Sequence, residues 1–127
     1  EKGAEMLMRW VSVGKADDVP LTKGSGGTFI DRNQRYLLTA NGETHQILRF
    51  ILFSDHLSEP KVLADNKDWF QPNDLCQTIS GDIYFTDPDF KNKKGGSVYH
   101  LSSKGVTAVT NNLPVPNGII ASNDCTN

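Results

Sequence analysis

The chain has 127 residues, of which 37% are hydrophobic and 22% charged, as in an ordinary globular domain. Its 13 basic and 15 acidic residues give a net charge of −2 and are spread along the chain, so no basic stripe indicates a nucleic acid or an acidic membrane as partner. The longest apolar run, residues 47–53, contains an arginine and is far shorter than the roughly 20 residues of a membrane-spanning helix. We therefore expect a soluble protein, whose compartment the sequence does not indicate.

Short runs rich in β-branched and aromatic residues recur along the chain, separated by clusters of Gly, Asn, Asp and Ser. No window of helical length keeps an apolar face at helical spacing, so we predict an all-β fold. The glycine-rich residues 23–27 are interpreted as an ordinary turn, because the helix and the ending of a phosphate-binding loop are missing. The expected strands lie at residues 6–13, 27–31, 36–40, 46–53, 61–64, 74–78, 82–86, 97–101 and 106–109.

These strands form a repeat, which indicates the architecture. The segments GTFID, NDLCQ and NGIIA begin at Gly27, Asn73 and Asn117, 46 and 44 residues apart. Four strands in a unit of this length are typical of a β-propeller blade. We predict about two and a half four-stranded blades, with a strand of a preceding blade at residues 6–13 and the first strand of a further blade at residues 117–121.

A blade has apolar faces toward both neighbours, and two or three blades do not bury what a closed ring buries. We therefore expect residues 1–127 to be one partial propeller domain, cut at both ends, whose remaining blades are missing from this chain.

Two linked segments carry a resemblance to a known family. Residues 71–101 contain a Pro-Asn-Asp blade start, a YFTDP strand and a G-x-V-Y-x-L strand, and residues 113–124 contain Pro-Asn-Gly-Ile followed by a Ser-x-Asp turn. Together they resemble the SMP-30/gluconolactonase/LRE-like family of six-bladed β-propeller lactonases. With the G-x-x-x-D and L-L-x-A pattern of residues 27–40, the resemblance covers most of the chain from about residue 6 onward.

The resemblance implies a metal-dependent hydrolase that opens a sugar or other small-molecule lactone. One divalent cation lies at the hub of the family's ring, with Ca²⁺ expected here and Zn²⁺ or Mg²⁺ as alternatives. Asn117 matches a metal-ligating asparagine, and Asn73 matches one that lies beside the metal and contacts substrate or a metal-bound water. Asp74 and His45 are further candidates for substrate binding. Amide oxygens suit a hard cation and add no negative charge, which leaves the metal a stronger Lewis acid.

The same resemblance places the family's acidic residues outside this sequence. A Glu-Gly-Pro ligand is expected ahead of Glu1, and an aspartate that is both a ligand and a proposed general base is expected beyond Asn127, so no catalytic residue is assigned here. The position two before the Asn-Asp pair, basic in some members, is Gln71, which does not support a strongly anionic substrate. We expect little activity from the chain in isolation.

Simpler interpretations stand beside these. Pro-Asn-Asp and Pro-Asn-Gly are strong turn formers in any β protein, and only their one-blade spacing favours a metal site over a turn. Asp74 is equally well explained as a strand-entry cap, and Asp87 is expected to begin an Asx-type turn. Trp69 is expected to pack between blades. The alternative function is a non-enzymatic NHL-like propeller that serves as a binding platform.

Overall fold

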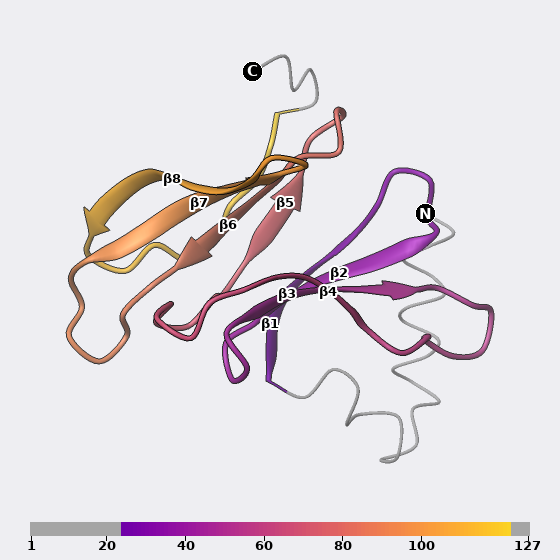
Figure 1. Ribbon diagram of the computed structural model, residues 1–127, viewed down its shortest axis with the longest axis horizontal. Helices are drawn as coiled ribbons and strands as arrows, with labels where there is room; N and C mark the ends of the chain where they lie inside the picture. The colour runs from indigo at the N-terminus through magenta and orange to yellow at the C-terminus, as the bar shows by residue number, and fades with distance from the viewer. Residues whose placement is uncertain (1–23, 123–127) are drawn as a thin grey trace.

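The computed structural model describes residues 24–122, which form β-strands joined by turns and loops, without a helix. The strands are β1 (Ser25–Ile30), β2 (Tyr36–Asn41), β3 (Gln46–Ile51), β4 (Lys61–Asp65), β5 (Leu75–Gln77), β6 (Ile83–Asp87), β7 (Gly96–Ser102) and β8 (Gly105–Leu113). They make two antiparallel four-stranded sheets, in the orders β1-β2-β3-β4 and β5-β6-β7-β8 (Figure 1). The all-β class and the four strands per repeat are confirmed. Nothing in residues 24–122 forms a helix of the length and apolarity needed to cross a membrane.

Each sheet is a meander, because its strands lie side by side in sequence order and are joined by turns and loops. In the first turn, the Oδ1 atom of Asp31 accepts hydrogen bonds from the backbone N–H groups of Arg35 and Tyr36, at 2.7 and 2.8 Å. In the next, the Oδ1 atom of Asn41 accepts the N–H of Thr44 at 3.0 Å. Such side-chain acceptors satisfy the backbone donors that a reversing chain leaves unpaired.

The two sheets meet through their first strands. The N–H of Gly27 in β1 donates a hydrogen bond to the C=O of Asn73, just before β5. The remaining strands of each sheet follow in order from this contact, and the facing sides of the two sheets pack against each other (Figure 1). This is the relation of neighbouring propeller blades, whose first strands line the hub.

The space between the sheets holds the main hydrophobic core. Trp69, with 6% of its surface exposed, packs edge-on against Phe85 with ring centroids 4.9 Å apart, so the prediction that Trp69 packs between blades is confirmed. The other buried members of this cluster are Leu38, Ala40, Ile47, Leu75 and Ile83. A second cluster, of Leu37, Leu48, Phe50 and Leu57, covers the opposite face of the first sheet. Because side chains alternate along a strand, Leu37 and Leu38 fall in different clusters.

Two predictions about strand positions are wrong. Residues 117–121 were expected to form a strand, but no described strand pairs with them, and a strand needs a partner for its backbone groups. Ser25 and Gly26 were expected in a turn but belong to β1, which begins ahead of the strand predicted from Gly27, and only Gly24 of the described glycines in this cluster has a turn-like φ of 83°. The predicted strand at residues 6–13 lies outside the described residues.

Candidate active site

Asn73 lies where the two sheets touch. Its N–H donates to the C=O of Thr86 in β6 at 2.9 Å, and its C=O accepts the N–H of Gly27 in the first sheet. The residue is half-buried, and hydrogen bonds to both sheets fix its backbone. A side chain on such a doubly held backbone is pre-oriented for binding.

Glycines make this contact between the sheets possible. A Cβ atom at Gly26 would overlap the carbonyl oxygen of Asn73, and one at Gly27 would overlap the carboxylate of Asp74 and come within 2.7 Å of its Cα. The sequence offered a signal for this, since glycine inside a strand often marks a close approach of another backbone. This signal was missed for Gly26, because the residue was assigned to a turn and not to a strand.

The carboxylate of Asp74 connects backbone groups of two segments. Its Oδ1 atom accepts the N–H of Leu75 at 2.9 Å, at the entry of β5, and its Oδ2 atom accepts the N–H of Ile119 at 3.1 Å. The strand-entry role expected for Asp74 is therefore present, and a link to the segment that follows Asn117 is added. Both carboxylate oxygens are engaged by backbone donors.

Thr86 connects the two candidate asparagines, and it was not singled out from the sequence. Its hydroxyl donates to the C=O of Asn117 at 2.7 Å and accepts the N–H of Asp74 at 3.2 Å, while its own C=O accepts the N–H of Asn73. Only 2% of its surface is exposed. The backbones of Asn73 and Asn117, 44 residues apart, are thus both hydrogen-bonded to Thr86, the first through its carbonyl group and the second through its hydroxyl group. The side chain of Asn117 itself is exposed.

Asp87 holds the chain that leads into Asn73. Its Oδ1 and Oδ2 atoms accept the N–H groups of Gln71 and Phe70, at 2.7 and 3.0 Å. Burial raises the pKa of the Asp87 carboxyl above its ordinary value, although these two hydrogen bonds and the nearby His45 act in the opposite direction. The Asx-type turn expected at Asp87 is instead made by Asp89, whose Oδ1 atom accepts two backbone N–H groups at 3.1 Å. The structural role was predicted correctly, but its geometry was not.

His45 lies in the β2–β3 turn, with a positive φ of 59°. Its Nδ1 atom is buried and has no hydrogen-bond partner among the described residues. The same turn approaches the segment before Asn73, because a Cβ atom at Gly42 would lie 3.1 Å from the carbonyl oxygen of Pro72. His45, Asp87 and Asn73 therefore share one end of the two sheets.

The candidate active site contains some of the oxygen ligands that a divalent cation needs. The amide oxygens of Asn73 and Asn117 suit a hard cation, which takes six to eight oxygen ligands in the case of Ca²⁺. Within residues 24–122 no three His, Cys, Asp or Glu side chains gather in a way that could hold a metal. By donor type the described residues fit such an ion, and they would fill only part of its shell.

A model of the SMP-30/gluconolactonase/LRE-like region matches residues 3–127, nearly the whole chain. The chain belongs to this family. Among solved structures, an X-ray structure described as a "putative gluconolactonase" is similar, with a TM-score of 0.65 and 20% sequence identity, and the match covers 80% of this chain. At that identity the likeness shows the fold alone. The chain spans 39% of that protein's length. No curated protein matches it. The two sheets of this SMP-30/gluconolactonase-like chain are thus blades of a propeller-like fold, as the repeat predicted.

Proposed function

We propose that the protein carrying this chain is a metal-dependent hydrolase that opens a sugar or other small-molecule lactone. One observation carries the proposal: in a member of this family, Thr86 binds the backbones of both Asn73 and Asn117 at the contact between blades. Two asparagines that serve only as turns would not need a common anchor.

In this proposal Asn73 and Asn117 hold a divalent cation through their side-chain oxygens, with Ca²⁺ as the first choice and Zn²⁺ or Mg²⁺ as alternatives. A bound cation of this kind polarises the lactone carbonyl and lowers the pKa of a bound water. The acidic ligands and the general base come from parts of the protein outside this chain.

The chain's own residues position these groups. Thr86 and Asp74 fix the backbone near the two asparagines, so only their side-chain amides have to be ordered when a ligand binds. His45 supplies an imidazole whose buried Nδ1 has no hydrogen-bond partner within residues 24–122, and we assign it, with Asp74, to the substrate side of the site. Gln71 is neutral, which agrees with an uncharged lactone as substrate.

Lactone hydrolysis tests this proposal, with the full-length protein and D-glucono-1,5-lactone in a pH-stat assay. We expect Asn117→Ala and Asn73→Ala each to lower kcat/KM by about 10- to 100-fold or more, the range seen when groups that tune a metal site are lost. Chelation with EDTA should abolish activity, and added Ca²⁺ should restore it.

The matched control is Asn111→Ala, an exposed asparagine in β8, which should leave kcat/KM unchanged. Full activity of both site variants would contradict the assignment of the asparagines. Absence of hydrolysis from a folded full-length protein, for this and other small lactones, would favour the non-enzymatic binding platform.

A further inference from the structure

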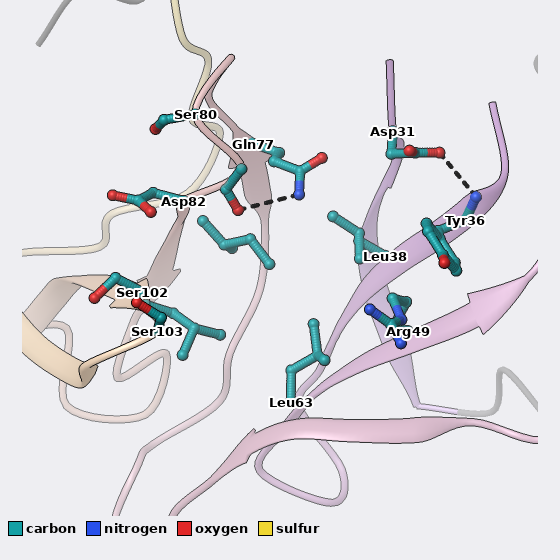
Figure 2. Close-up of a pocket in the computed structure, with 13 residues that line it drawn as sticks. Asp31, Tyr36, Leu38, Arg49, Leu63, Gln77, Ser80, Asp82, Ser102 and Ser103 are labelled. Carbon is teal, nitrogen blue, oxygen red and sulfur yellow. Dashed lines mark hydrogen bonds between the residues drawn. The ribbon is translucent and has the colours of Figure 1, made fainter. Parts of the chain in front are cut away.

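A cavity lies between the two sheets, at the end opposite the candidate active site. It has a volume of about 450 Å³, within the range of small-molecule sites. Asp31, which follows β1, and Asp82, which follows the short strand β5, both line it, whereas Asn73 precedes β5. Both sheets contribute to its walls, as Figure 2 shows.

One wall carries the guanidinium of Arg49, which has no ionic partner among residues 24–122. The guanidinium of Arg49 lies 4.5 Å from the ring centroid of Tyr36, which fixes its orientation by a cation–π contact. No carboxylate in the part of the chain that the structure describes forms an ion pair with Arg49. Among these residues, its charge is not neutralised by a neighbouring acid.

The two acids of the cavity are already engaged. Asp31 accepts two backbone N–H groups through its Oδ1 atom. Asp82 lies across the cavity from Arg49 (Figure 2), and its Oδ2 atom is 2.8 Å from the Nε2 atom of His100. Neither acid forms an ion pair with Arg49 among residues 24–122, and the carboxylates of Asp31 and Asp82 together set a limit on how much negative charge a ligand can bring.

The rest of the lining suits a short carbon skeleton with hydroxyl groups. Between the polar walls lie four aliphatic side chains, Leu38, Leu63, Ile83 and Leu101. Opposite Arg49, the hydroxyl of Ser102 accepts the N–H of Lys104 at 3.2 Å and keeps its own proton to donate, and Ser103 adds a second hydroxyl (Figure 2).

We propose that this cavity binds a small hydroxylated monocarboxylate, with the carboxylate on Arg49, the carbon skeleton on the aliphatic side chains and a hydroxyl at Ser102 and Ser103. A planar carboxylate matches the fork of a guanidinium. A single guanidinium in a lining that also holds the two carboxylates of Asp31 and Asp82 favours one negative charge over the two of a phosphate. This inference does not depend on the lactonase proposal, because none of these residues belongs to the candidate active site.

Titration calorimetry of the full-length protein with sodium 2-hydroxyisocaproate tests it. This probe carries one carboxylate, one hydroxyl and a branched aliphatic chain. We expect binding, a loss of about tenfold or more in affinity in Arg49→Gln, and a smaller loss in Arg49→Lys, which keeps the charge without the fork. The probe should also shift the methyl NMR signals of Leu63 and Leu101.

Three controls separate this site from others. Arg35→Gln alters the other guanidinium near the Tyr36 ring, at 5.5 Å, which does not line the cavity, and it should leave the affinity unchanged. Asn117→Ala, which changes the candidate active site, should do the same. Replacing the carboxylate of the probe by a CH₂OH group should abolish binding.

Unchanged affinity in a folded Arg49→Gln variant, absence of binding in the parent protein, or loss of binding in Asn117→Ala would each overturn the proposal. Inorganic phosphate that binds at Arg49 as tightly as the probe would overturn the assignment of a monocarboxylate.

Discussion

At the scale of single residues, Thr86 is the side chain on which the candidate site depends most directly. Its hydroxyl satisfies a buried backbone donor at Asp74 and a backbone acceptor at Asn117 at once. Thr39 is also a buried threonine, in β2, but its hydroxyl has no hydrogen-bond partner among the described residues. The chain thus offers a matched pair, in which the same substitution removes a used hydroxyl in one case and an unused one in the other.

We predict that Thr86→Val lowers the free energy of unfolding by about 1–3 kcal/mol, since it leaves two backbone groups without their partner. Thr39→Val should have no effect or raise that free energy slightly, because valine has the same shape and no polar atom to bury. Urea denaturation of the three proteins measures both values. Equal effects of the two substitutions would contradict the role given to the Thr86 hydroxyl.

At the scale of elements, most strands could be predicted from the sequence, because a half-buried strand needs alternating apolar residues between turn formers. The predicted bounds are wrong where strand pairing, and not composition, determines whether a strand forms and where it ends. β8 continues past the polar residues Thr110, Asn111 and Asn112 to Leu113 along β7, and residues 117–121 have a strand-like composition without a described partner strand.

The candidate site shows the same division between local pattern and long-range contact. The repeat gave the positions of Asn73 and Asn117, and the structure joins their backbones as one-blade spacing requires. The side-chain hydrogen bonds of Thr86 and Asp87 link residues 12 to 31 positions apart, and no local sequence pattern encodes which partner such a side chain meets. Gly27 could have been recognised as a point of close approach, since it was predicted as the first residue of a strand, whereas Gly26 was assigned to the preceding turn.

The contact of β1 with the start of β5 leads to a prediction at this scale. Gly27→Ala should lower the free energy of unfolding by about 1–3 kcal/mol, because the added methyl group overlaps Asp74 and forces the first strands apart. Gly118→Ala is the control: its Cβ would lie 3.8 Å from the nearest atom, Oδ2 of Asp74, an ordinary contact. We expect a change within about 0.5 kcal/mol there. Thermal or urea unfolding compares the two, and a Gly27→Ala protein as stable as its parent would contradict the close approach.

At the scale of the whole molecule, the two ends of the inter-blade contact differ in chemistry. One end gathers amides, a histidine and a buried acid around Asn73, and the other holds the cavity with Arg49. The apolar side chains of Ile79, Val109 and Ile120, which are 56, 56 and 90% exposed in residues 24–122, are the kind of surface that a further blade would cover. This agrees with a chain that spans 39% of a similar propeller-like protein.

The central claim is that Asn73 and Asn117, one blade apart, bind the same cation. A crystal structure of the full-length protein grown with CaCl₂ tests it most directly. We expect one ion within about 2.3–2.6 Å of a side-chain oxygen of each asparagine. An ion held elsewhere, or the two amides directed away from each other with a well-ordered hub between them, would contradict it.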